Sequence, residues 1–187
     1  MKFPMLVFLT ITASAASAQM PKHAASTDKD KVADALRAGP TFITRNATLL
    51  DWPSTPAGEY RVLRKGADDW SCLPGSPQLP HDEPMCLDRV FLRFMKDSFA
   101  GRDPRADGLG VAYMYAGAWV PHSTTEGKRP DQYFHVGPHI MIVTPNQSDL
   151  RAFTTNGAAG DVYINHLPGR SEMFLVIPIR GWNERPR

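Results

Sequence analysis

Two histidines, His135 and His139, are the side chains of this sequence best suited to chemistry. If the segment around them is extended, alternate side chains share one face, and Met141 then lies on the same side. Imidazole and thioether donors suit copper, and imidazole also suits zinc. In a straight strand the two histidines would be about 13 Å apart, so a shared metal requires a sharp bend at Gly137-Pro138. A copper or zinc site, an acid–base or ligand-contact role, and a structural role in the sheet all stay open.

A second polar cluster is formed by His81, Asp82 and Glu83, which are consecutive in the sequence. A histidine beside two carboxylates can bind a cation. Surface loops carry such clusters by chance, so the pattern alone does not select a cation site.

Four aromatic residues are candidates for a ligand pocket: Tyr113, Tyr115, Trp119 and Phe134. Aromatic side chains in strands more often belong to the core, so both interpretations stay open. The sequence contains no nucleophile elbow, no H-E-x-x-H helix, no P-loop and no dinucleotide-binding glycine pattern. We therefore assign no catalytic residue, and the sequence does not decide whether the protein is an enzyme.

The chain has two cysteines, Cys72 and Cys86, at the ends of a proline-rich loop. Prolines lack an N–H and fix φ, so this loop cannot form a regular strand ladder. The spacing does not resemble the short paired spacing of zinc sites. We predict a Cys72–Cys86 disulfide, which would close a loop of about 15 residues and contribute roughly 3 kcal/mol.

Residues 1–18 have the pattern of a secretory signal peptide. Lys2 precedes an apolar run from Phe3 to Ile11, and Ala16-Ser17-Ala18 is a small-residue cleavage site. We therefore predict an exported protein, periplasmic or secreted, with no membrane span in the mature chain. An oxidising compartment would preserve the predicted disulfide.

Length and charge indicate one domain with a real core. The 187 residues carry a formal net charge of +2, and the basic residues are scattered rather than clustered. This distribution does not favour nucleic-acid binding. We divide the chain into a signal peptide (1–18), a leader with a short N-terminal helix (19–40) and a single globular domain (41–187).

The periodicity predicts an α+β, mainly β fold with seven or eight short, mostly antiparallel strands. Thr27 caps a short helix to about Ala38, with Asp30 at the capping-box position. An amphipathic helix begins just before Cys86, capped by Asp82 or Glu83, and stops at Gly101. Strands are expected at 47–52, 59–65, 70–73, 110–119, 133–144, 151–155, 161–165 and 173–179.

Several short motifs resemble those of a group of exported bacterial proteins that have no established activity. The clearest are W-x-C-x-P (Trp70–Pro74), P-M-C-x-D (Pro84–Asp88) and G-P-H-I-M-I-V (Gly137–Val143). N-A-T (46–48), L-R-K-G (63–66) and a terminal I-P-I (177–179) extend the resemblance over most of the chain. The resemblance implies a single exported domain and no particular reaction.

Taken together, the sequence favours an exported, disulfide-stabilised binding or structural module of the bacterial envelope. Its partner would be a small molecule or an envelope protein, and we predict no cofactor. The alternative is a copper- or zinc-dependent enzyme, or a metal-handling protein, that uses His135 and His139.

Overall fold

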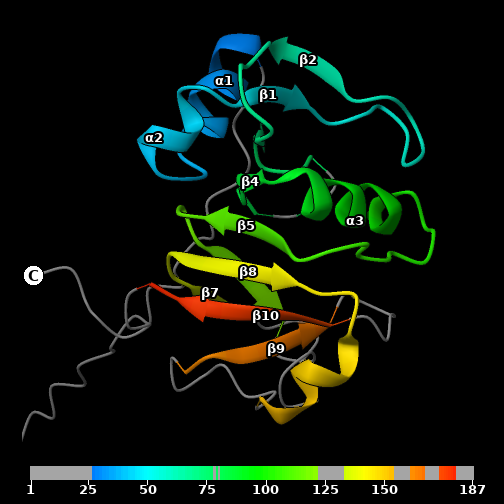
Figure 1. Ribbon diagram of the computed structural model, residues 1–187. Coiled ribbons are helices and arrows are strands. Elements are labelled where there is room, and N and C mark those ends of the chain that lie inside the picture. The colour runs from blue at the N-terminus through cyan, green and yellow to red at the C-terminus, as the bar shows by residue number, and fades with distance from the viewer. Residues whose placement is uncertain are drawn as a thin grey trace, which may run out of the picture.

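A computed structural model of the chain describes residues 27–77, 79, 81–121, 133–153, 161–166 and 173–179. Within these residues the chain forms one eight-stranded sheet, a separate two-stranded ribbon and helical segments packed on the large sheet (Figure 1). The predicted mainly β, α+β single domain is confirmed. The predicted signal peptide and the first part of the leader lie outside the described residues.

The elements are short. The helical segments are α1 (Asp28–Ala35), α2 (Thr41–Thr44), α3 (Arg89–Phe99) and the 3₁₀ helix η2 (Gln147–Ala152). The strands are β1 (Thr48–Asp51), β2 (Arg61–Arg64), β3 (Ser71–Leu73), β4 (Met85–Leu87), β5 (Gly110–Met114), β6 (Ala118–Pro121), β7 (Tyr133–Val136), β8 (His139–Val143), β9 (Tyr163–His166) and β10 (Met173–Pro178).

The large sheet has the order β2-β1-β3-β4-β5-β8-β10-β9. Its one parallel pair joins β1 to β3, and its other neighbouring pairs are antiparallel, as predicted. β6 and β7 form the separate antiparallel ribbon. The first two strands, β1 and β2, form an antiparallel hairpin.

Two predicted long strands are each broken into two. The segment 110–119 divides into β5 and β6 around Gly117, whose φ of +82° belongs to the left-handed region that glycine tolerates. The segment 133–144 divides into β7 and β8 at Gly137-Pro138, since proline cannot donate to a ladder. These breaks move β6 and β7 out of the large sheet and into the ribbon.

The amphipathic helix exists, but its predicted start is wrong. Residues 85–87 extend as β4, because each pairs with a residue of β3. The helix α3 begins later, at Arg89, and its cap is Asp88 rather than Asp82 or Glu83. The Asp88 carboxylate accepts hydrogen bonds from Phe91 N at 2.7 Å and Val111 N at 2.8 Å. One side chain therefore starts the helix and attaches it to β5.

The strand predicted at 151–155 is also wrong over its described part, which belongs to η2 and the residue after it. Polar side chains before it hydrogen-bond within the turn, with Asn146 Nδ2 donating to Asp149 and Ser148 Oγ donating to Asn146. Such local bonds compete with strand pairing.

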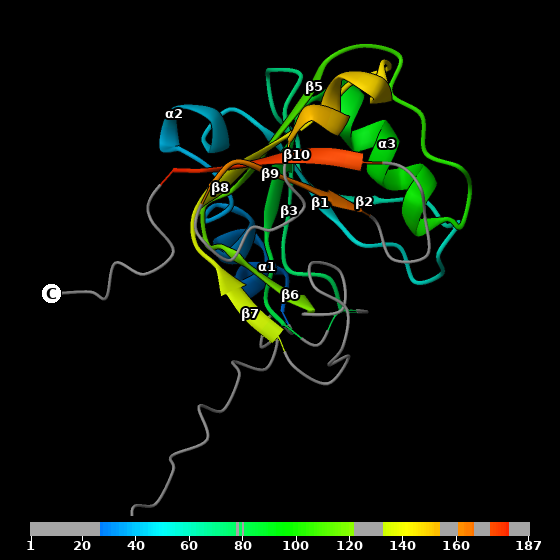
Figure 2. The ribbon, with the colours of Figure 1, turned by 90° about the horizontal axis from the view of Figure 1, so that it is seen from below.

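The two faces of the large sheet carry different hydrophobic clusters, because successive residues of a strand point to opposite faces. One face packs under α3 and includes Leu73, Met114 and Met141. The other face packs under α1 at one end, where Cys72 and Cys86 are buried, and against Leu150 of η2 at the other end. Figure 2 shows α1 and α3 on opposite sides of the strands between them.

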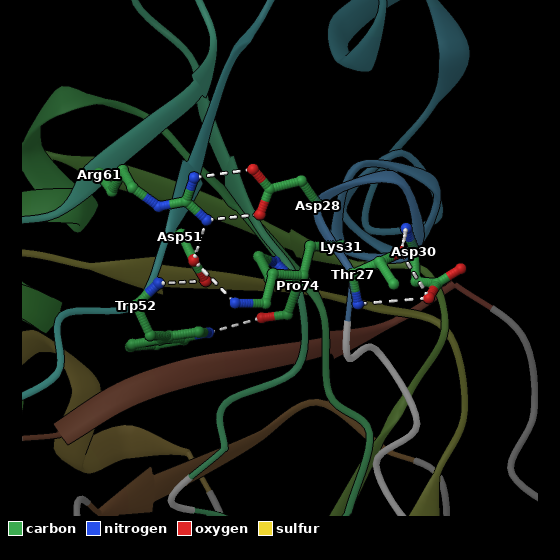
Figure 3. A network of polar contacts seen from close by, with 8 residues as sticks. All are labelled: Thr27, Asp28, Asp30, Lys31, Asp51, Trp52, Arg61 and Pro74. Atoms are coloured by element: carbon green, nitrogen blue, oxygen red, sulfur yellow. Dashed lines mark hydrogen bonds and ion pairs between the residues drawn. The ribbon is translucent and has the colours of Figure 1, made fainter.

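The helix α1 has the predicted capping box, in which Thr27 and Asp30 bond each other's side chain and backbone. An ionic network then holds the start of α1 against β1 and β2 (Figure 3). Arg61 pairs with Asp28 at 2.6 Å and with Asp51 at 2.8 Å, and Lys31 pairs with the same Asp51 at 2.8 Å.

Candidate functional site

Cys72 and Cys86 form a disulfide, as predicted. They face each other directly on β3 and β4, so the bond joins two neighbouring strands rather than a strand and a helix start. Both residues are fully buried. The cross-link closes the proline-rich segment 74–84, which we call the disulfide loop.

Neighbouring elements hold the disulfide loop by individual hydrogen bonds. Trp52, just after β1, donates its indole N–H to Pro74 O at 2.7 Å (Figure 3). Asp34 of α1 accepts from Gly75 N at 2.8 Å. At the other end of the loop, Glu83 accepts from Trp119 N of β6 at 2.9 Å. Two buried carboxyl groups therefore fix the loop between α1 and the β6–β7 ribbon.

The Asp34 carboxyl is buried beside a second carboxyl, that of Asp82. The same Arg37 nitrogen, Nη1, lies 2.8 Å from Asp34 and 3.0 Å from Asp82. Burial and the neighbouring Asp82 charge raise the pKa of Asp34 to about 6, against the opposing effects of Gly75 N–H and Arg37. This carboxyl therefore changes its protonation in mildly acidic solution.

The Glu83 carboxyl is also buried and also has a raised pKa. Burial raises its pKa to about 7, and the charge of Asp82 contributes to the increase, while the hydrogen bond from Trp119 N opposes it. A carboxyl group with a pKa near neutrality can act as an acid or a base. Nothing in the sequence indicates this burial, because Glu83 stands in a polar stretch beside a proline.

The three residues of the predicted His81-Asp82-Glu83 cluster point to different partners. Asp82 pairs with Arg37, and Glu83 binds Trp119 N. His81 is buried, which lowers its pKa, and its ring lies 5.4 Å from the Trp119 ring.

His135 and His139 occupy different sheets. His135 is exposed on β7, directly opposite Trp119, with its ring 5.0 Å from the indole. His139 is buried on β8, and its Nδ1 lies 2.7 Å from Gly137 O. Burial lowers the pKa of His139 to about 4, and the nearby His135 adds to this decrease. The charge of His135 therefore acts on His139 although the two residues belong to different sheets.

Met141, the third predicted ligand, shares a face of β8 with His139 but packs in the α3 cluster. Among the described residues, no group of three or more His, Cys, Asp or Glu side chains is placed to hold a metal ion.

The predicted aromatic candidates do not form one group. Trp119 contacts His81 and His135 at the ribbon. Tyr113 belongs to β5 of the large sheet, and its ring lies 5.4 Å from the Trp70 ring and 5.7 Å from the Tyr115 ring. Phe134 pairs with Val120 in the ribbon, and its side chain is outside the described part of the structure.

Tyr113 belongs to a row of apolar side chains in the middle of the large sheet. It is directly opposite Ile140, which is opposite Ile177 on the next strand. These three residues are partly exposed, and Tyr115 and Ile179 at the ends of β5 and β10 are 37% and 42% exposed. We call this surface the open face; it consists of Trp70, Tyr113, Tyr115, Ile140, Ile177 and Ile179.

A surface pocket of about 320 Å³ lies elsewhere, between the α3–β5 connection and the start of η2. Its polar amide, Gln147, is already used: Nε2 donates to Thr144 O and Oε1 accepts from Met173 N. None of the predicted site residues lines this pocket.

Comparison of the chain with protein-family models, with curated proteins and with solved structures finds no match. In the part of the chain that the structure describes, no helix has the length and apolar character needed to cross a membrane. Function is therefore inferred from the contacts of the described residues.

Proposed function

We propose that this chain is an exported, disulfide-stabilised binding module of the bacterial envelope, and that its ligand binds on the open face. The observation that carries the proposal is the row Tyr113, Ile140 and Ile177, left partly exposed at the centre of an eight-stranded sheet. Covered neighbours lie on both sides of this row: α1 packs over Cys72 and Cys86, and Leu150 of η2 packs against Leu175.

The composition of the open face indicates the class of ligand. Its six residues are three aromatic and three isoleucine side chains, with no carboxylate, amine or guanidinium among them. Tyrosine and tryptophan combine a large apolar surface with a polar edge. We therefore expect an uncharged ligand group with aliphatic or aromatic surface, carried by a small molecule or by an envelope protein.

Binding of the uncharged dye Nile red would test the open face. Ile140→Thr and Ile177→Thr keep β-branched side chains suited to a strand but add a hydroxyl to the surface. Each should weaken saturable dye binding several-fold, while Val62→Thr, at a residue 56% exposed on the edge strand β2, should not. Equal binding by all variants, with melting curves confirming that they fold, would contradict the proposal.

The export part of the proposal rests on residues 1–18 and is supported by the buried disulfide, a bond that oxidising compartments preserve. Protein recovered from such a compartment should have an intact mass that begins at Gln19. A mass that retains Met1 would contradict export.

A second candidate function is binding of copper or zinc at His135 and His139. The specific observation is that His135 lies near enough to His139 for its charge to lower the pKa of His139, although the two residues belong to different sheets. Elemental analysis of untagged protein should then find stoichiometric copper or zinc that is lost in His139→Ala. Metal-free protein that takes up neither ion on refilling would exclude this candidate.

A further inference from the structure

The Cys72–Cys86 disulfide is sealed under α1 and the turn that follows it. Both cysteines are 0% exposed, and Ala35 and Ala38 pack in the same cluster. The turn approaches so closely that a Cβ on Gly39 would lie 3.4 Å from Cys86 Sγ. A reductant can therefore reach the disulfide only after part of this cover has moved, and the end of α1 is one part of it.

The two ends of α1 are held by different kinds of contact. At the start, the Arg61, Asp28, Asp51 and Lys31 network pairs opposite charges (Figure 3). A hydrogen bond from Arg61 lowers the pKa of Asp28. The pKa of Asp51 is also lowered: burial opposes the decrease, but hydrogen bonds from Lys31 and Arg61 outweigh it. This end therefore stays ion-paired throughout neutral and mildly acidic solution.

At the other end of α1 two carboxyl groups meet one guanidinium. Asp34 faces Asp82 of the disulfide loop, and Arg37 bridges them. Arg37 can balance only one negative charge. Glu83, next to Asp82 in the disulfide loop, is a third carboxyl group in this region. When both aspartates are ionised, a buried like-charge repulsion acts directly on the contact that holds α1 to the loop.

We propose that the C-terminal end of α1 is a proton-dependent cover over the Cys72–Cys86 disulfide, closed while the Asp34 carboxyl beside Asp82 holds a proton and loosened when Asp34 ionises. The groups that carry this inference, Asp34, Arg37 and Asp82, are not part of the open face, although Trp70 and Tyr113 pack against the same cysteine cluster. The inference goes beyond the proposed binding function.

The direction of the pH dependence follows from the linkage between opening and proton binding. In the closed form the pKa of Asp34 is raised from its ordinary value of 3.8 to about 6, so opening releases a proton. The closed form is most favoured at acidic pH and loses its advantage as the pH rises through about 6. With these two values, the opening equilibrium increases about tenfold between pH 5 and pH 8.

The test is the rate at which a water-soluble phosphine reduces the disulfide of the full chain. Each turnover yields two thiols and a phosphine oxide whose oxygen comes from water. Thiols are counted by alkylation and mass measurement, and each rate is divided by that of a small peptide disulfide at the same pH. The normalised rate of the wild type should rise about tenfold from pH 5 to pH 8.

Asp34→Asn should flatten this rise, because an amide still accepts from Gly75 N but cannot ionise. Asp82→Asn removes the like charge, so it should also reduce the slope, and it provides a second variant if Asp34→Asn does not fold. Asp107→Asn, which removes an exposed partner of Arg93 far from α1, should keep the slope of the wild type.

Either of two results would overturn the proposal. One is a slope in Asp34→Asn and Asp82→Asn equal to that of the wild type. The other is a reduction rate that follows global unfolding at every pH, shown by the same dependence on urea as the unfolding equilibrium. Both are independent of Nile red binding, so failure here leaves the proposed function intact.

Discussion

Glu83 provides the sharpest prediction about stability. The residue is 8% exposed, and the pKa of its carboxyl is raised from 4.5 to about 7, chiefly by burial. The folded protein therefore binds a proton that the unfolded chain has released, so this group stabilises the fold at acidic pH and the contribution is lost as the pH rises through 7. Between pH 5 and pH 8 the loss is about 2.5 kcal/mol.

Glu83→Gln should abolish this loss. The glutamine keeps an oxygen that can accept from Trp119 N and resembles the protonated carboxyl in shape. We would measure the free energy of unfolding in urea by tryptophan fluorescence at several pH values. The variant should gain about 2.5 kcal/mol relative to the wild type between pH 5 and pH 8.

Only the difference in the free energy of unfolding between wild type and Glu83→Gln is informative, because other groups titrate in the same pH range. Burial keeps His139 neutral by lowering its pKa to about 4, so its contribution has the opposite sign: stability is lost as the pH falls below the ordinary histidine value of 6.5. That contribution cancels in the comparison with Glu83→Gln. Glu59→Gln, at an exposed position, serves as the control. If Glu83→Gln and the wild type have parallel pH profiles, the reasoning about buried Glu83 is refuted.

Three further predictions concern the framework. Reduction of Cys72–Cys86, which are 14 residues apart, should lower the free energy of unfolding by about 3 kcal/mol; an unchanged urea midpoint after confirmed reduction would contradict this. Phe91→Ala, at a fully buried position of α3, should lower the free energy of unfolding by about 3–5 kcal/mol. Leu109→Ala, at an exposed position, should change it by no more than about 0.5 kcal/mol. Equal losses of stability in the two variants would refute the assigned core. Asp88→Ala should cost about 1–2 kcal/mol and Asp88→Asn less, measured by thermal melting; the reverse order would argue against its role as a cap.

The sequence predicted those parts of the fold that local chemistry determines. The Thr27 capping box, the strands beside polar turns and the glycine stop of α3 each depend on a few neighbouring residues. The disulfide was predictable because two cysteines allow one intramolecular pairing. Where the prediction failed, pairing at a distance had decided the outcome: β4 is a strand because β3 lies beside it, although its residues continue the helical pattern of α3.

The candidate site was predictable only in part, for the same reason. Sequence reasoning singled out His135 and His139, but it could not show that the bend between them would send one to the ribbon and the other to the large sheet. It also grouped Tyr113 with Trp119, which the strand break at Gly117 separates. The burial of Asp34 and Glu83 has no signature in composition or periodicity, because it depends on where the disulfide loop comes to lie.

The position of these buried carboxyls follows from the nature of that loop. A segment rich in proline has few N–H donors and cannot extend the sheet, so individual side chains must attach it to the domain. Asp34 does so from α1, and Glu83 does so by accepting from the start of β6. Carboxyl groups serve both contacts well because they accept backbone N–H bonds strongly, but burying them against this loop raises their pKa values toward neutral pH. A loop held in this way is tightest in mild acid, so any change of its position should follow the pH of the compartment in which the protein resides.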